Sequence, residues 1–130
     1  DALAQGTAVM AKVVGYATHS MEPALFTVAP VGAMTKLLNQ LGWDKAGVDL
    51  WEINEAFAMV TMLAVKELGL DEAKVNVNGG ACALGHPIGA SGARILVTLI
   101  HALKARGLKR GIASLCIGGG EAVALAVEVA

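Results

Sequence analysis

The segment at residues 122–129 constrains the fold more than any other feature of the chain, because both of its faces are apolar. Alternate positions put one set of apolar side chains on each face: Val123, Leu125, Val127 and Val129, and opposite them Ala122, Ala124 and Ala126. No polar residue interrupts this pattern before Glu128. A strand that is apolar on both faces needs a covering layer on each side. The segment therefore predicts a sheet with helices on both faces.

The rest of the chain supplies strands and helices in alternation. Runs of β-branched and small apolar residues predict further strands at 8–17, 48–53, 75–77 and 111–117. Apolar stripes at helical spacing, each closed by a glycine, predict helices at 30–41, after Asn54 as far as 68, and at 87–106. The order β-α-β-α-β-α-β-β predicts an α/β fold with a five-stranded mixed sheet, mostly parallel, whose last strand is antiparallel.

Composition bounds the classes of protein that this chain can belong to. Its 130 residues are 55% hydrophobic, which suits one domain over residues 1–130 and leaves no room for a second. A net charge of -1, spread along the sequence, predicts no nucleic-acid or membrane partner. Because the segment 1–6 lacks signal-peptide features and does not begin with Met, we expect a fragment whose targeting information is lost, so an organelle stays open.

The two cysteines predict neither a metal site nor a disulfide framework. Cys82 and Cys116 lie far apart in the sequence and form no CxxC pattern. We therefore expect no bound metal and a reducing, cytoplasmic compartment. The neighbours of Cys82 are Ala81 and Ala83, which predicts a role in packing for its thiol.

A local basic run ends the helix expected at 87–106. Lys104, Arg106, Lys109 and Arg110 follow one another without an acidic neighbour. Cations at the end of a helix complement its dipole, and the same four charges would suit an anion site. Both interpretations remain open on sequence alone.

Three polar clusters follow the ends of predicted strands, at the edge where open α/β sheets bind ligands. Asn54 can cap the following helix, with Glu55 complementing the helix dipole, or it can hold a water or a substrate oxygen. His86 precedes the predicted start of a helix at Pro87, where the dipole disfavours a second positive charge and keeps the imidazole neutral for proton transfer. It can equally be a hydrogen-bonded structural residue.

The third cluster is the run Cys116-Ile117-Gly118-Gly119-Gly120. A cysteine in a buried strand is ordinarily an inert apolar residue, and three glycines can serve only to make a tight turn. The alternative is a functional thiol beside exposed backbone N–H groups.

Taken together, these clusters resemble a known family. Asn54-Glu55-Ala56-Phe57, the run from Gly79 to Gly92 that contains Gly85-His86-Pro87, and Cys116 to Gly120 closely resemble thiolases of the acetyl-CoA acetyltransferase type, in order and spacing over nearly the whole chain. The resemblance implies an αβαβα fold of two similar halves, of which this chain is the second. The nucleophilic cysteine of the family belongs to the first half.

The resemblance also implies a role for each motif residue in reversible Claisen condensation of acyl-CoA. His86 would activate the absent nucleophile, and Cys116 would deprotonate the α-carbon of a second acetyl-CoA. His86 and a water held by Asn54 would form one oxyanion hole, and the backbone N–H near Gly118 would contribute to another.

The resemblance further implies contacts with the acyl-CoA substrate. These contacts fall on Phe26, Ala56 and Phe57. Phe26 stands where many family members have Met in a Met-Gly-x-Gly-Pro stretch, and this chain reads Phe26-Thr27-Val28-Ala29-Pro30, which leaves the acyl preference open.

The leading hypothesis is therefore the C-terminal half of a thiolase, acting in fatty acid metabolism. We expect coenzyme A thioesters as substrates and no further cofactor, an N-terminal thiolase half as partner, assembly as a homo-oligomer, and no activity in the isolated chain. One alternative is a non-catalytic thiolase-like domain that binds CoA or acyl groups or serves assembly. A ketoacyl-synthase type of condensing enzyme would ordinarily carry His in place of Cys116.

Overall fold

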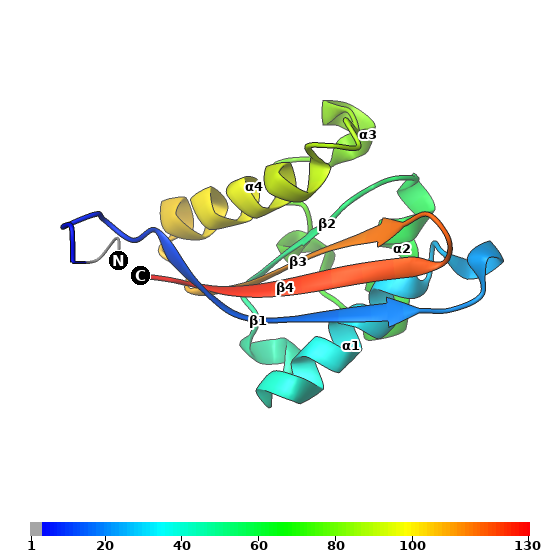
Figure 1. Cartoon of the computed structure of the whole chain (residues 1–130), viewed down its shortest axis with the longest axis horizontal. Coiled ribbons are helices and arrows are strands. Elements are labelled where there is room, and N and C mark those ends of the chain that lie inside the picture. The colour runs from blue at the N-terminus through cyan, green and yellow to red at the C-terminus, as the bar shows by residue number, and fades with distance from the viewer. Residues whose placement is uncertain (1–3) are drawn as a thin grey trace.

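The computed structural model describes residues 4–130 and consists of a mixed sheet between two layers of helices (Figure 1). Its strands are β1 (Ala11–Ser20), β2 (Leu50–Ile53), β3 (Arg110–Ile117) and β4 (Glu121–Val129). Its α-helices are α1 (Ala29–Leu41), α2 (Ala58–Leu68), α3 (Ala81–Leu84) and α4 (Ser91–Arg106). Short 3-10 helices lie at Pro23–Leu25, Lys45–Gly47 and Glu72–Lys74. Helix α4 lies on one side of the sheet, and α1 and α2 lie on the other (Figure 1).

The sheet has four described strands in the order β1-β4-β3-β2. Strand β4 pairs antiparallel with both β1 and β3, and β2 pairs parallel with β3, with Ile53 opposite Ser114. The prediction that the last strand is antiparallel is confirmed. The glycine turn between β3 and β4 is too short for the crossover that a parallel pair would need. The prediction of a mostly parallel, five-stranded sheet is wrong.

The missing strand is the one predicted at 75–77. Val75 makes a single parallel bridge to Trp51, and Asn76 then adopts a left-handed conformation with φ of 46°. Asparagine tolerates this conformation better than most residues. The side-chain amide of Asn76 continues the pairing where the backbone leaves it, bonding both the N–H and the C=O of Ile53. Hydrogen bonds from a side chain thus replace the backbone hydrogen bonds that a fifth strand would make.

Two helices begin later than their sequence patterns predict. Helix α2 begins at Ala58, with Phe57 as its N-cap residue. Helix α4 begins at Ser91, and Pro87 instead opens a turn whose carbonyl accepts from the N–H groups of Ala90 and Ser91. Of the small residues around this start, 89–90 and 92–93 are exposed and Ser91 is buried.

The core lies on both faces of the sheet, as the apolar alternation of 122–129 predicts. On one face, α1 and α2 cover Trp51, Ile53 and Ile112. On the other face, α4 covers Leu50 and Val127 with side chains such as Leu99, which is fully buried. Truncating a buried leucine of this kind to alanine typically costs about 2–5 kcal/mol. The two layers hold the adjacent ends of β2 and β3 in place, and the polar clusters follow these ends.

No helix of residues 4–130 is long and apolar enough to cross a membrane.

Candidate functional site

Asn54 is held at the end of β2 and is not a helix cap. Its backbone N–H donates to the carbonyl of Ser114 on β3 at 2.9 Å, and the residue is fully buried. Its Oδ1 accepts from Nη2 of Arg94 at 3.4 Å, whereas its Nδ2 is buried with no hydrogen-bond partner. Because α2 begins three residues beyond Glu55, the capping interpretation of both residues is wrong. A buried amide with an unused donor is ready to bind an oxygen.

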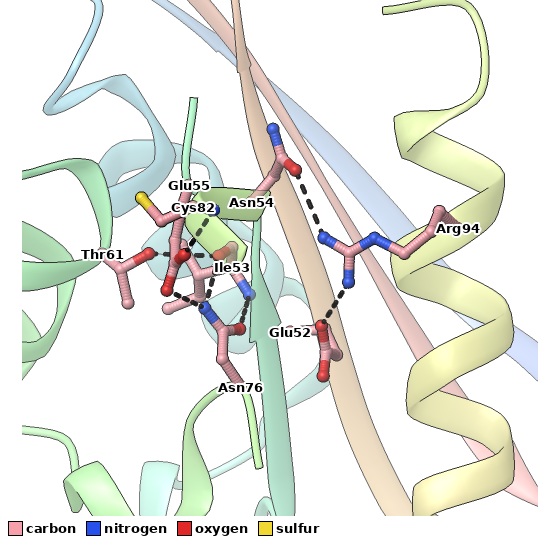
Figure 2. A network of polar contacts seen from close by, with 8 residues as sticks. All are labelled: Glu52, Ile53, Asn54, Glu55, Thr61, Asn76, Cys82 and Arg94. Atoms are coloured by element: carbon pink, nitrogen blue, oxygen red, sulfur yellow. Dashed lines mark hydrogen bonds and ion pairs between the residues drawn. The ribbon is translucent and has the colours of Figure 1, made fainter. Parts of the chain in front are cut away.

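Arg94 comes from the first turns of α4 and also binds Glu52 (Figure 2). Its Nη1 lies 3.2 Å from Oε2 of Glu52, a residue that is 1% exposed. Burial raises the pKa of Glu52 to about 7, although the nearby guanidinium lowers it. Glu52 and Asn54 point from the same side of the chain toward α4, because alternate residues of a strand share a face. Sequence reasoning singled out neither Arg94 nor Glu52.

The carboxylate of Glu55 accepts hydrogen bonds from the loop that leads to His86. Its Oε1 accepts from Nδ2 of Asn76 at 3.3 Å, and its Oε2 accepts from the backbone N–H of Cys82 at 3.0 Å (Figure 2). A Cβ on Gly80 would lie 2.3 Å from the carboxyl carbon of Glu55, so only glycine allows this approach. Glu55 therefore binds the first turn of α3, not that of α2 as expected.

The thiol of Cys82 is exposed, and its predicted role in packing is wrong. A hydrogen bond to the carboxylate of Glu55 is the main cause that raises the pKa of this thiol. The residue belongs to the edge of the loop and not to the core.

His86 lies between α3 and α4, where Ser91 fixes its ring. Its Nδ1 lies 2.5 Å from Oγ of Ser91, and that hydroxyl donates to the carbonyl of Pro87 at 3.2 Å. A hydroxyl has a single hydrogen, and that of Ser91 is used at Pro87, so the hydroxyl accepts from Nδ1–H of His86 and Nε2 is left for other partners. Ala90 is the N-cap residue of α4, so the expected position of His86 directly before a helix start is wrong. No sequence pattern indicates the contact with Ser91 that fixes the imidazole.

Cys116 is the penultimate residue of β3 and is 8% exposed. Burial raises the pKa of its thiol, and a backbone hydrogen bond opposes that shift. In the turn that follows, Gly119 and Gly120 have φ of 92° and 87°, which explains these glycines by conformation alone. Gly118 has no positive φ, and a Cβ there would meet nothing within 4 Å. The tight turn therefore does not require a glycine at 118.

Two of the expected substrate-contacting residues touch each other. The rings of Phe26 and Phe57 lie edge to face, with centroids 6.0 Å apart. Phe57 is 58% exposed, and Ala56 beside it packs against the core. The structure thus builds a partly exposed aromatic pair beside the end of β2.

The polar residues of the three clusters are gathered at one edge of the sheet. Ile53 is opposite Ser114, so Asn54 follows the end of β2 and Cys116 lies near the end of the neighbouring strand β3. The side chain of Cys116 packs in the core cluster that α1 and α2 cover, whereas that of Asn54 faces α4. Helix α4 contacts the other two parts of the site, since Ser91 binds His86 and Arg94 binds Asn54. Residues one turn apart on this helix therefore bind the imidazole of His86 and the amide of Asn54.

The basic run does not form one cluster. Lys104 and Arg106 lie in the last turn of α4, which Gly107 closes, as the dipole interpretation expects. Arg110 pairs with Glu128 at 2.9 Å and lies over the ring of Trp43. Arg110 thus has an acidic partner from β4, although none lies beside it in the sequence.

No group of three or more potential metal ligands occurs among residues 4–130.

Comparisons with known proteins show the family to which the chain belongs. Residues 7–129 match the model of the thiolase C-terminal domain. The chain is 53% identical over 123 residues to an acetyl-CoA acetyltransferase of Allochromatium vinosum, covering 95% of this chain and 31% of that protein. It is 54% identical over 127 residues to an acetyl-CoA acetyltransferase of Escherichia coli, covering 98% of this chain and 32% of that protein.

Solved structures share the fold over nearly the whole chain. The acetyl-CoA acetyltransferase of Bacillus anthracis superposes with a TM-score of 0.96 at 50% identity, over 99% of this chain and 33% of that one. The Acat5 thiolase of Ascaris suum, solved in complex with coenzyme A, gives 0.92 at 49% identity, again over 99% of this chain and 33% of that one. The present chain thus spans about a third of the length of its relatives.

Proposed function

The chain belongs to the thiolase family as a C-terminal domain, and from that premise we propose that it supplies the general base and the oxyanion-hole residues for reversible Claisen condensation of acyl-CoA. One observation carries the proposal. The first turns of α4 hold an imidazole through Ser91 and a buried amide through Arg94, and Cys116 lies near the end of β3 in the same sheet. An acid–base group, a donor without a partner and a thiol at one sheet edge suit chemistry at a thioester carbonyl.

His86 carries out the first proton transfer in this proposal. With Nδ1–H directed at Ser91, Nε2 can take the proton of a cysteine supplied by an N-terminal half. The thiolate then attacks the thioester of an acyl-CoA and the C–S bond to CoA breaks. The leaving CoA thiolate takes a proton from the thiol of Cys116, so Cys116 is left as a thiolate and His86 keeps its proton on Nε2. The acyl group is now on the enzyme.

The thiolate of Cys116 removes a proton from the α-carbon of a second acetyl-CoA, and the resulting carbanion attacks the acyl carbon of the acyl-enzyme. A C–C bond forms, the C–S bond to the nucleophilic cysteine breaks, and that cysteine leaves as a thiolate that takes its proton back from Nε2 of His86. Burial raises the pKa of the Cys116 thiol, which makes its thiolate a stronger base. A thiol of pKa about 8.5 in water is still a weak base for this task, so stabilisation of the enolate decides the rate.

Asn54 and His86 provide that stabilisation at the thioester oxygen. The unused Nδ2 of Asn54 would hold a water, which donates to the oxygen together with His86. In surroundings with little water, one such donor is worth about 3 kcal/mol. The backbone N–H near Gly118 serves the acylated centre in a second oxyanion hole, where a side chain would crowd the acyl group.

The aromatic pair Phe26 and Phe57, with Ala56, forms the proposed contact with the CoA substrate. The open side of the Phe57 ring offers an apolar surface for the pantetheine arm. A related thiolase was solved in complex with coenzyme A, which supports a substrate of this class. No other cofactor enters the proposed reaction.

The N-terminal half belongs to the proposal because the α4 face of the sheet is incompletely covered. A groove of about 290 Å³ runs between α4 and the sheet, lined by apolar side chains such as Leu96, Leu115 and Val123. Tyr16 and Val13 on β1 are also exposed, at 66% and 54%. Apolar surface of this kind marks an interface. We propose that the missing half covers it and that the complete protein is a homo-oligomer in a reducing, cytoplasmic compartment.

The test uses the complete enzyme that contains this chain. Wild type should condense acetyl-CoA and cleave 3-ketoacyl-CoA with CoA, and His86→Ala and Cys116→Ala should each abolish both reactions. His101→Ala and Cys82→Ala are the matched controls, because both residues are exposed and neither side chain has a role in the proposed chemistry. Full activity in either site variant would refute the proposal.

A further inference from the structure

Arg94 joins two buried acceptors that lie on one face of β2 and its extension. Its two terminal nitrogens bind Oε2 of Glu52 at 3.2 Å and Oδ1 of Asn54 at 3.4 Å. The side chain of Arg94 is 22% exposed and that of Glu52 is 2% exposed, so the contacts lie largely away from solvent. The planar fork of a guanidinium suits such a bridge, whereas an ammonium has no second fixed arm.

This contact decides which end of the Asn54 amide faces Arg94 and which end points away from it. A guanidinium only donates hydrogen bonds, so the Asn54 atom that faces it must be the oxygen. The Nδ2 group consequently points away from Arg94, as Figure 2 shows, and it is buried without a partner. Without Arg94 the amide could turn over and present its oxygen, which repels the enolate oxygen instead of stabilising it.

We propose that Arg94 is a positioning residue for the enolate step, holding the Asn54 amide with its N–H₂ group toward the water at the thioester oxygen. The inference rests on the proposed function and adds to it. Glu52 has a supporting role, because its carboxylate holds the other arm of the guanidinium. Arg94 itself touches neither substrate nor water in this scheme.

A merely structural role for Arg94 would have a different consequence. If the guanidinium only neutralised Glu52, its loss would disturb the packing of α4 on β2 and would lower every activity of the enzyme together. The proposed role predicts a selective loss, since Asn54 acts in one oxyanion hole and the acylated centre uses the other.

Two assays of the complete enzyme separate these steps. Condensation of acetyl-CoA requires the enolate. Exchange of labelled CoA into acetyl-CoA requires only that the acyl group move to the nucleophilic cysteine and back to a CoA thiol. For Arg94→Gln we expect condensation to fall about tenfold or more, since removing one oxyanion-hole donor costs roughly 100- to 1000-fold. Exchange should stay within about twofold of wild type, which also shows that the variant is folded.

Further variants complete the test. Arg110→Gln, which removes an arginine–glutamate pair at the other end of β3, should change neither assay. In an Asn54→Ala background, Arg94→Gln should cause no additional loss, because Arg94 acts through Asn54. If Arg94→Gln does not fold, Arg94→Lys keeps a cation beside Glu52 and should show the same selective loss to a smaller degree.

The outcomes are distinguishable from failure of the proposed function. A wild-type enzyme without condensation activity would refute the proposed function itself. An active wild type in which Arg94→Gln lowers both assays equally, lowers neither, or adds its full effect in the Asn54→Ala background would overturn only the assignment of Arg94.

Discussion

The side-chain amide of Asn76 pairs with the backbone of Ile53 as a neighbouring strand would. Its Oδ1 accepts from the Ile53 N–H and its Nδ2 donates to the Ile53 C=O, each at 2.8 Å. The backbone N–H of Asn76 donates to Trp51 at 2.9 Å, just before the chain turns away. The end of β2, from which Asn54 and Glu55 project, is therefore held on this side by Asn76 together with Thr61, whose Oγ1 also donates to the Ile53 C=O at 3.1 Å.

Replacing Asn76 should destabilise the protein markedly. Asn76→Ala leaves the N–H of Ile53 without its partner and removes one of the two donors to the Ile53 C=O, which keeps its hydrogen bond from Oγ1 of Thr61 at 3.1 Å. It also puts alanine at a positive φ, so we expect a loss of about 2–4 kcal/mol. Asn78→Ala is the matched control, since Asn78 is exposed in the same loop, and it should change stability by less than about 0.5 kcal/mol. Thermal unfolding of the complete protein measures both. Equal unfolding temperatures would show that the Ile53 pairing contributes little.

Asn76 also explains what sequence patterns could and could not predict about the fold. The layers, the antiparallel end of the chain and most elements follow from periodicity, because apolar faces must be buried whatever the details. Val75 and Val77 resemble a strand, and Val75 does pair with Trp51. No strand forms beyond this bridge because the side chain of Asn76 takes the hydrogen bonds of Ile53 that a neighbouring backbone would otherwise make. A pattern of apolar residues gives no sign of such a side-chain contact.

The buried carboxyl of Glu52 should make stability depend on pH. Burial raises the pKa of Glu52 from its ordinary value of 4.5 to about 7. Between these values the unfolded chain has released the proton and the folded protein has kept it, so stability falls as pH rises and levels off above about pH 7. Glu52→Gln lacks this titration. Its stability relative to wild type should therefore rise by roughly 2–3 kcal/mol between pH 4.5 and 7.5.

Unfolding midpoints of wild type and Glu52→Gln, compared across that pH range, measure the effect. Titrations of other groups cancel in the comparison. A difference that stays constant with pH, or that shrinks as pH rises, would mean that Glu52 ionises in the folded protein as it does in the unfolded chain.

The sequence could predict the polar residues of the candidate site, but not the residues that hold them in place. Asn54 follows the end of one strand and Cys116 lies near the end of another, as their sequence positions predict, whereas His86 does not lie directly before the start of α4. Their partners come from distant parts of the chain, since Arg94 lies on α4 and reaches back to β2. A helical arginine and a strand glutamate look like ordinary surface charges until the helix is packed on the sheet.

Gly80 should be indispensable because of Glu55. A Cβ at Gly80 would lie 2.3 Å from the Glu55 carboxyl carbon, so Gly80→Ala must displace that side chain from the Cys82 N–H. We expect a loss of about 1–3 kcal/mol and a fall in thiolytic activity, since the loop before His86 loses its attachment. Gly47→Ala, whose Cβ would meet nothing closer than 3.9 Å, is the control. Unchanged unfolding and activity in Gly80→Ala would show that Glu55 does not hold the loop.

Ser91 should govern the tautomer of His86. In wild type the hydroxyl accepts from Nδ1–H, and nitrogen NMR of the ring should find the proton on Nδ1. In Ser91→Ala that preference disappears, and we expect thiolysis to fall by about 10- to 100-fold, within the range that general acid–base catalysis contributes. Thr98→Ala, farther along α4, is the control. A proton found on Nε2 in wild type would contradict the assignment.

Neighbouring glycines of the turn after β3 should respond in opposite ways to alanine. At Gly120, φ is positive and a Cβ would lie 2.3 Å from the carbonyl oxygen of Met21, so Gly120→Ala should lower stability by more than about 2 kcal/mol. At Gly118 the added Cβ meets nothing, so Gly118→Ala should unfold at the wild-type temperature. It should nevertheless lose acyl transfer, because the proposed acylated centre occupies that space. Calorimetry and CoA exchange on both variants separate the two roles. A fully active Gly118→Ala enzyme would mean that the open space beside Cys116 is not where the acyl group is held.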